Sequence, residues 1–165
     1  MEKGNSPTNI NIESHSPQET EQIGEKIGQN LTIGNVLALK GPLGAGKTCL
    51  VKGIARSLGI NEEITSPTYT IITEYEANPA AENGQPNQER FPFYHIDAYR
   101  LNGDEDFDAL GGEDYLGGRG IAVVEWAERI EKSFSGETLK AEIIILDGNR
   151  RLIKLDAALY KGERG

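Results

Sequence analysis

The chain has 165 residues, 37% of them hydrophobic, which is enough for one domain built around one core. Its 26 acidic and 17 basic residues give a formal net charge of -9, so the chain as a whole repels a phosphate backbone. No apolar run reaches the roughly 20 residues of a membrane span, and the polar first residues do not resemble a signal peptide. A single cysteine, Cys49, excludes an internal disulfide. We expect a cytoplasmic protein without membrane contact and without strong nucleic-acid binding of its own.

The start of the chain predicts a strand followed by a helix. Residues 1–9 have the composition of a disordered terminus, and residues 10–12 alternate like a short edge strand. Ser16 and Glu19 have the spacing of a capping box, and a proline stands at the first helical position between them. Apolar residues then recur at four-residue steps, so we expect a helix over residues 16–30 with one buried face.

Residues 41–48 read Gly-Pro-Leu-Gly-Ala-Gly-Lys-Thr, which matches the G-x-x-x-x-G-K-S/T phosphate loop. The apolar run 36–39 precedes it, which is typical of a strand covered on both faces, and a helix-like stretch, 47–58, follows. Lys47 would reach the β- and γ-phosphates of a nucleotide, and Thr48 would offer its hydroxyl to Mg²⁺. The pattern and its context predict a nucleotide site rather than an ordinary glycine-rich turn.

The middle of the chain predicts a hairpin, a helix and another buried strand. Residues 70–75 and 93–96 are rich in β-branched and aromatic side chains and are expected to be strands. A long solvent loop, residues 77–90, joins them. Residues 104–110 predict a short acidic helix, and 121–124 a fully apolar strand. A solvated helix face explains the acidic cluster better than a docking surface for a basic partner does.

The last part predicts a helical stretch over 127–134 and a closing hairpin of residues 143–146 and 152–155. Strands therefore alternate with helices around a phosphate loop. This pattern predicts an α/β protein with a three-layer P-loop NTPase fold, whose sheet is mainly parallel with antiparallel additions. We expect all of it to form a single domain over residues 1–165.

Two acids, Asp97 and Glu125, each follow an apolar strand, at the end where side chains converge on the ligand crevice of a parallel sheet. A carboxylate there holds Mg²⁺ or orients an attacking water, although a strand-terminal acid can also simply cap the next element. His95 has no partner cluster in the sequence and is interpreted as a core or ordering residue. Trp126 is interpreted as a core residue, with packing beside a nucleotide as the alternative.

A polar segment, Ser66-Pro67-Thr68-Tyr69-Thr70, lies between the helix after the loop and the next strand. Many P-loop hydrolases carry a switch there, whose hydroxyl senses the γ-phosphate. The proline biases the residue before it toward extended geometry, so an ordinary turn explains the segment equally well.

Four motifs in order resemble the TsaE (YjeE) family, bacterial P-loop ATPases needed for tRNA threonylcarbamoyladenosine synthesis. Besides the phosphate loop, they are Ser-Pro-Thr-Tyr-Thr at 66–70, Tyr-His-Ile-Asp-Ala-Tyr-Arg-Leu at 94–101 and Val-Glu-Trp-Ala-Glu at 124–128. The resemblance runs from about residue 16 to residue 155. It implies ATP and Mg²⁺ as ligands and a switch-like role for residues 66–70.

The resemblance also implies roles for individual residues. Lys47, Asp97 and Glu125 would serve catalysis, and Thr48, Asp97 and Glu125 would lie at the metal. The nucleotide-binding residues that it implies are Gly44, Ala45, Gly46, Lys47, Thr48 and Cys49, together with Thr20 and Arg151 near the adenine or the phosphates. The phosphate-loop pattern adds Gly41 and Leu43.

In that family a companion pair, TsaB and TsaD, transfers the threonylcarbamoyl group to adenosine A37 of tRNA. TsaE is understood to bind the pair and to use ATP hydrolysis to keep it turning over. The resemblance thus implies a Mg²⁺-dependent, partner-stimulated ATPase that is not itself the transferase. The loop alone leaves open a small-molecule or nucleoside kinase, although no Arg-rich lid is evident, and a nucleotide-gated binding module. A GTPase is disfavoured because no Asn-Lys-x-Asp segment is present.

Overall fold

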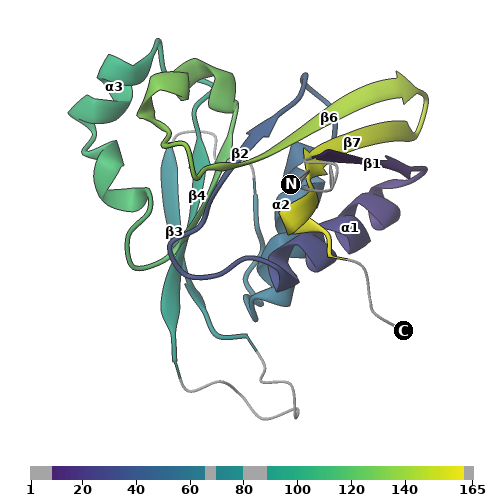
Figure 1. The fold of residues 1–165 in the computed structure, drawn as a ribbon, viewed down its shortest axis with the longest axis horizontal. Coiled ribbons are helices and arrows are strands. Elements are labelled where there is room, and N and C mark those ends of the chain that lie inside the picture. The colour runs from purple at the N-terminus through teal and green to yellow at the C-terminus, as the bar shows by residue number, and fades with distance from the viewer. Residues whose placement is uncertain (1–8, 66–69, 80–88, 162–165) are drawn as a thin grey trace, which may run out of the picture.

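The computed structural model describes residues 9–65, 70–79 and 89–161. Within these ranges one sheet contains seven strands in the order β1-β7-β6-β2-β5-β4-β3 (Figure 1). The strands are β1 Asn9–Ser14, β2 Val36–Lys40, β3 Ile72–Ala77, β4 Phe91–Asp97, β5 Ile121–Glu125, β6 Leu139–Asp147 and β7 Arg150–Asp156. The helices are α1 Pro17–Gln29, α2 Lys47–Ser57 and α3 Asp104–Ala109, with 3-10 helices η1 Gly112–Tyr115, η2 Ala127–Ser133 and η3 Ala157–Leu159.

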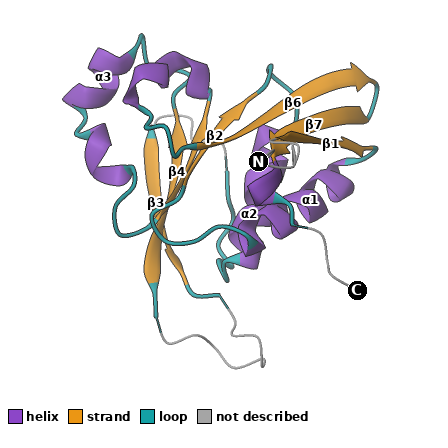
Figure 2. Ribbon diagram, in the orientation of Figure 1, coloured by secondary structure: helices purple, strands orange, loops and turns teal. Residues whose placement is uncertain are grey.

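The sheet is parallel in its centre and antiparallel at its sides. Strands β6, β2, β5 and β4 are parallel neighbours, and β1, β7 and β3 are antiparallel additions. Figure 2 shows strands β6 and β7 joined as a hairpin, with β1 beside them. The predicted α/β class and mixed sheet are therefore confirmed. In the central registers Glu125 lies beside Leu39 of β2 on one side and beside Asp97 of β4 on the other. The carboxyl ends of three parallel strands thus meet at one edge of the sheet.

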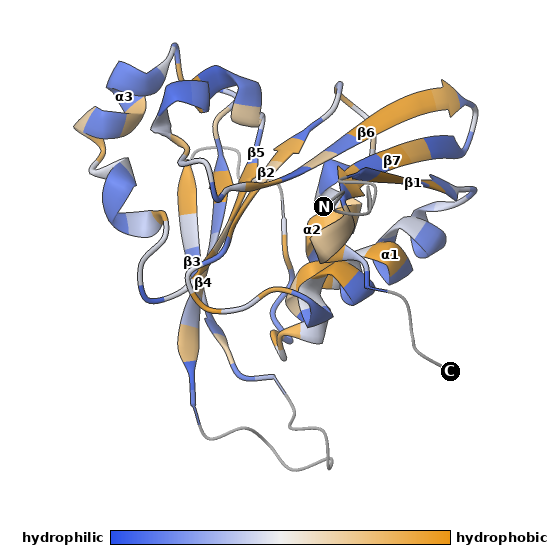
Figure 3. Cartoon of the chain, in the orientation of Figure 1, coloured by the Kyte–Doolittle hydropathy of each residue, from blue (hydrophilic) through white to orange (hydrophobic). Residues whose placement is uncertain are grey.

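Helices cover both faces of this sheet and enclose two hydrophobic clusters. Helices α1 and α2 pack on one face over residues such as Leu37, Phe93 and Ile143, and α3 and η2 pack on the other over residues such as Ile96 and Val124. Hydrophobic residues line the central strands, whereas α3 is mainly hydrophilic (Figure 3). None of the helices in the described ranges is long and apolar enough to cross a membrane.

Local signals in the sequence explain how α1 begins. The hydroxyl of Ser16 accepts the N–H of Glu19 at 3.1 Å, and the Glu19 carboxylate accepts the N–H of His15 at 2.7 Å. These bonds satisfy backbone donors that the first turn of a helix leaves unpaired. The predicted capping box is therefore present, with the return bond made one residue earlier than in the usual motif.

Glycines allow α1 and α2 to approach each other closely. A Cβ atom on Gly24 of α1 would lie 2.2 Å from the carbonyl oxygen of Leu50, and one on Gly53 of α2 would lie 1.9 Å from the carbonyl oxygen of Glu21. Both distances are shorter than van der Waals contact, so only glycine fits at either position. The close packing fixes α2, which directly follows the phosphate loop, against the rest of the fold.

The structure corrects four predictions about the ends or the type of elements. Asn9, assigned to the disordered terminus, is paired with Asp156 in β1, while residues 1–8 lie outside the described ranges. Ala77 ends β3, so the long connection begins one residue later than predicted, and residues 80–88 of it lie outside the described ranges.

The third correction concerns β6, which begins at Leu139, four residues before the predicted hairpin strand. Its first part pairs in parallel with β2, and its second part pairs with β7. The fourth concerns the helical stretch after Trp126, which is the 3-10 helix η2 with a non-helical residue at Ile130. Trp126, the residue before this helix, has a left-handed backbone conformation.

Candidate functional site

The phosphate loop connects β2 to α2, as the sequence predicted. Gly44 and Gly46 have φ angles of 78° and 106°, in the left-handed region that favours glycine. The N–H of Ala45 closes the turn by donating to the carbonyl oxygen of Pro42 at 3.1 Å. Gly46 is the N-cap of α2 and has no side chain with which to cap it. No side chain caps the first N–H groups of α2, which lie at the positive end of the helix dipole, where an anion could bind.

Lys47 is the first residue of α2, and its ammonium group is held inside the loop. Its Nζ donates to the carbonyl oxygens of Gly41 at 2.5 Å and Pro42 at 3.0 Å, and lies 4.0 Å from the centre of the Trp126 ring. Only 5% of the residue is exposed. Burial lowers the pKa of the Lys47 ammonium from its usual range, and the charge of Glu125 acts in the opposite direction. The loop therefore contains a positive charge that a phosphate oxygen could bind.

Thr48 and Glu125 face each other across the sheet edge. The hydroxyl Oγ1 of Thr48 lies 3.5 Å from Oε1 of Glu125, although 77 residues separate the two in the chain. Glu125 closes β5 and is 2% exposed. Because β5 lies beside β2 in a parallel register, its last residue is placed next to the start of the phosphate loop. Two of the three residues assigned to the metal, Thr48 and Glu125, are thus brought together.

Asp97 closes β4 and lies beside Glu125 in the parallel register. Its Oδ1 accepts the N–H of Tyr99 at 3.0 Å. Burial raises the pKa of the Asp97 carboxyl above its usual range, the hydrogen bond from Tyr99 opposes that change, and the charge of Glu125 adds to it. A carboxyl group with a raised pKa, next to Glu125 at the end of a parallel strand, has the properties of a general base.

His95 proves to be a partner of Glu125. It is fully buried on β4, and its Nε2 is hydrogen-bonded to Oε2 of Glu125. The sequence interpretation of His95 as a core or ordering residue agrees with this position. It could not identify the partner, because the contact depends on the register of two strands that are 30 residues apart in the chain.

Trp126 directly follows Glu125 and is the non-glycine residue with positive φ among those described, at 58°. This conformation turns its ring over the Lys47 ammonium, and the ring of Tyr99 packs against it with centres 4.9 Å apart. The residue is thus partly core, as predicted, and also a wall of the site. The contact with Lys47 was not predicted, since left-handed backbone at a tryptophan has no signal in the sequence.

Thr20 and Arg151 lie beside the phosphate loop. They help to line a hollow of about 120 Å³ together with Ser16, Pro17, Gly44, Ala45, Gly46, Cys49 and Asn149. Arg151 donates to the carbonyl oxygens of Ala45 at 3.1 Å and Gly44 at 3.3 Å, and Oγ1 of Thr20 lies 2.8 Å from the buried hydroxyl of Ser14. Two larger hollows share no residue with the loop, so size alone would not have identified the site.

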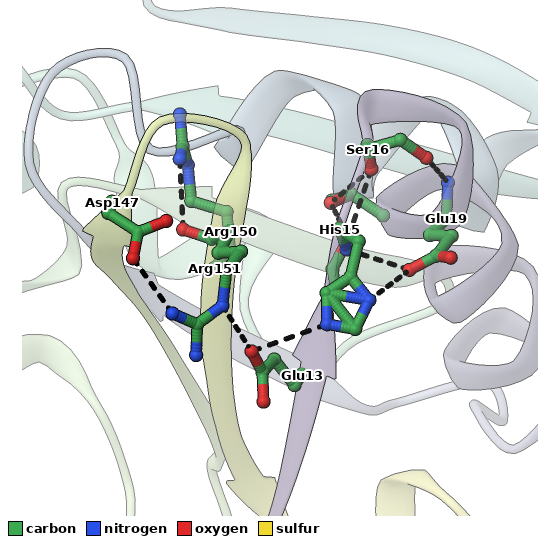
Figure 4. Close-up of polar contacts among 9 residues, drawn as sticks. Glu13, His15, Ser16, Glu19, Asp147, Arg150 and Arg151 are labelled. Carbon is green, nitrogen blue, oxygen red and sulfur yellow. Dashed lines mark hydrogen bonds and ion pairs between the residues drawn. The ribbon is translucent and has the colours of Figure 1, made fainter.

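A network of ionisable side chains connects β1, the start of α1 and the turn between β6 and β7 (Figure 4). Glu13 of β1 accepts from Nε of Arg150 at 2.7 Å and pairs with His15 at 3.3 Å. Arg150 also bonds Asp147 at 2.8 Å across the turn between β6 and β7. These pairs are exposed and contribute little stability individually, but they connect the hairpin turn to β1 and the start of α1.

The remaining predicted site residues differ in whether their side chains line the hollow. Leu43 is 81% exposed at the loop tip, so its side chain makes no wall of the site. Cys49 is half-buried and lines the hollow beside Thr20. Of the switch-like segment, Thr70 is exposed, whereas Ser66, Pro67, Thr68 and Tyr69 lie outside the described residues.

The donor atoms at the sheet edge fit a magnesium ion. Mg²⁺ prefers oxygen ligands, and in nucleotide sites it takes one or two carboxylates, with phosphate oxygens and water completing its shell. Thr48, Glu125 and Asp97 supply a hydroxyl and two carboxylates. Across the described ranges no group of three His, Cys, Asp or Glu side chains forms a metal cage. The hydroxyl and the carboxylates could serve a magnesium ion whose remaining ligands are phosphate oxygens and water.

Comparisons with known proteins show which family this chain resembles. The sequence profile of the family described as "Threonylcarbamoyl adenosine biosynthesis protein TsaE" matches residues 14–153. A tRNA threonylcarbamoyladenosine biosynthesis protein TsaE from Treponema pallidum is 41% identical over 140 residues, which cover 84% of this chain and 95% of that protein. The Bacillus subtilis protein of the same name is 39% identical over 128 residues, covering 78% of this chain and 73% of its own.

A solved structure is similar as well. The crystal structure of Bacillus subtilis YdiB superposes with a TM-score of 0.68 at 34% identity, covering 89% of this chain and 84% of that one. The sequence comparisons and the structural comparison thus cover most of the chain and lead to the same family. This chain belongs to the TsaE family of threonylcarbamoyl adenosine biosynthesis proteins.

Proposed function

We propose that this chain is a Mg²⁺-dependent ATPase that supports threonylcarbamoylation of adenosine A37 in tRNA by binding and recycling a TsaB–TsaD transferase pair. The observation that carries the proposal is the phosphate loop with Lys47 inside it and Thr48 facing Glu125 at 3.5 Å. Family membership supports the pathway. The net charge of -9 is consistent with docking on RNA-handling proteins rather than on RNA itself.

The chain's own groups divide the work of hydrolysis. The N–H groups at the start of α2 and the Lys47 ammonium bind the phosphates, while Thr48 and Glu125 hold the metal. Magnesium supplies positive charge that stabilises the negative charge on the phosphate oxygens. Trp126 covers the ammonium of Lys47 and shields it from water.

Asp97 is the proposed base, because its pKa is raised and it lies one strand further from the loop than Glu125. It orients the attacking water and accepts its proton as the water oxygen bonds to the γ-phosphorus. The bond between that phosphorus and the bridging oxygen breaks, and ADP leaves with the electron pair. The products are ADP and inorganic phosphate.

The test of the ATPase is phosphate release from Mg²⁺·ATP by the wild type and by Lys47→Ala. The substitution removes the positive charge inside the loop, so we expect the rate to fall by about 100-fold or more. Lys154→Ala is the matched control, because that lysine is exposed on β7 and should leave the rate unchanged. Equal rates for the wild type and Lys47→Ala would contradict the assignment of the loop.

The test of the partners is capture of purified TsaB and TsaD by the immobilised chain with ATP, with ADP and without nucleotide. We expect capture to depend on the nucleotide, and phosphate release to rise when the pair is added. Phosphate release that the pair leaves unchanged, together with transfer of phosphate to an added nucleoside, would favour a kinase instead. Nucleotide-dependent capture without any hydrolysis would favour a binding module.

A further inference from the structure

His95 occupies a position where packing alone favours an apolar side chain. It is fully buried on β4, on the same face as Phe93 two residues earlier, within the cluster beneath α1 and α2. Its Nε2 is bonded to Glu125, whereas its Nδ1 is buried and has no partner among the described residues. A buried polar atom without a partner destabilises a fold, so the imidazole is not explained by the stability of the core.

The two oxygens of Glu125 have different neighbours. Oε2 is bonded to Nε2 of His95, and Oε1 lies 3.5 Å from the hydroxyl of Thr48. An ionised carboxylate only accepts hydrogen bonds, so this contact needs the tautomer of His95 in which Nε2 is the donor. The bond fixes the rotation of the carboxylate about its last torsion, which is otherwise broad and roughly two-fold.

We propose that His95 is a positioning residue of the nucleotide site: its Nε2–H holds Glu125 so that Oε1 faces Thr48 and the magnesium of a bound nucleotide. The inference rests on the proposed function, because it needs a magnesium ion at Thr48 and Glu125. Carboxylates that bind metals are commonly held by a second hydrogen bond, and loss of that bond weakens metal affinity by about 10- to 100-fold. The hydrogen bond of His95 is made to Glu125, and this bond is the route by which the proposal has His95 act on the metal position.

The experiment is a calorimetric titration of the ATP analogue AMP-PNP into the full chain, with Mg²⁺ and again with EDTA. The ratio of the two affinities is the magnesium increment. In His95→Leu we expect this increment to fall by about 10- to 100-fold while the affinity in EDTA stays within about twofold of the wild type. His95→Gln retains a side-chain N–H that can reach Glu125 and should keep most of the increment.

Two controls separate positioning from a general effect on folding. Phe93→Leu changes the packing of the same face of β4, so it should lower the melting temperature and leave the magnesium increment unchanged. In a Glu125→Gln background, His95→Leu should cause no further loss, because the residue through which it acts is already altered.

The outcomes distinguish the two proposals. A full magnesium increment in His95→Leu, or an equal loss of affinity with and without magnesium, would overturn the positioning role and leave the nucleotide site intact. Additive losses in the double variant would overturn it as well. A wild type that binds no AMP-PNP under either condition would overturn the proposed function, and this inference with it.

Discussion

Lys47, His95 and Glu125 are 5%, 0% and 2% exposed, although charged and polar groups lose their hydration when they are buried. Each has partners that partly replace water: two carbonyl oxygens and an indole ring for Lys47, and each other for His95 and Glu125. Trp126 adds backbone strain, since left-handed geometry costs a non-glycine residue roughly 1–2 kcal/mol. Such departures from good packing commonly mark a functional site, and here they all gather at one edge of the sheet.

Asp97 gives a prediction about pH and stability. Its pKa is raised in the folded protein, mainly by burial, so the folded state binds this proton more tightly than the unfolded state does. The stability that the protonated Asp97 carboxyl contributes is complete at pH values below the usual pKa of an aspartate. It is lost as the pH rises through the raised pKa of Asp97 in the folded protein. Asp97→Asn should therefore raise the melting temperature at pH 7, and the gain should disappear below about pH 3, where Asp97 is protonated in both states.

Scanning calorimetry of the two proteins from pH 3 to pH 7 measures this difference. The amide oxygen of the variant can still accept the N–H of Tyr99, so the local turn is preserved. Glu137→Gln is the matched control, since Glu137 is an exposed acid away from the phosphate loop and should show no such gain. A variant less stable than the wild type at pH 7 would show that the Asp97 carboxylate is stabilising instead.

At the scale of elements, α1 and α2 form a unit that holds the phosphate loop. Their glycines let the two backbones touch, and α2 starts at the residue after the last glycine of the loop. Thr20 of α1 reaches the same hollow as Gly46 of the loop. A shift of α1 relative to α2 would therefore change both the stability and the shape of the nucleotide site.

Gly24→Ala tests this coupling. The added Cβ would meet the carbonyl oxygen of Leu50 at 2.2 Å, and a backbone atom cannot move aside without shifting α2. We expect the free energy of unfolding to fall by roughly 1–3 kcal/mol, as for other overpacked cores, and ATP affinity to weaken. Denaturant unfolding and ATP titration measure the two effects.

Gly136→Ala is the control for that change, because a Cβ there would meet no atom within 4 Å. It should leave both the unfolding free energy and the ATP affinity close to the wild type. Unchanged unfolding of Gly24→Ala would show that the two helices have room to separate.

The sequence predicted those elements whose signals are local. Ser16 with Glu19 marked the start of α1, and the glycines of residues 41–48 marked the loop, because capping and turn geometry depend on neighbours in the chain. The first part of β6 was missed at Leu139, since its strand conformation comes from pairing with β2. The contact of His95 with Glu125 was missed for the same reason: the register between distant strands is a property of the assembled sheet.

At the scale of the whole molecule, the fold gathers the site at one edge from four separate parts of the chain. The phosphate loop, the ends of β4 and β5, and the β6–β7 turn with Arg151 all meet there, and α1 closes the side of the hollow. The chain as a whole has a net charge of -9, so ATP bound at this site would have to be held by local donors against an unfavourable overall field. Magnesium reduces the negative charge of the triphosphate. The affinity of the chain for ATP should therefore depend strongly on the ion.

The most direct test of the central claim is a calorimetric titration of ATP into the wild type and into Lys47→Ala, with magnesium present and then chelated. We predict saturable binding of one ATP per chain, weaker binding when magnesium is removed, and no measurable binding to Lys47→Ala. Wild-type protein that gives no saturable heat, or that gives the same curve as Lys47→Ala, would contradict the claim that this loop binds ATP.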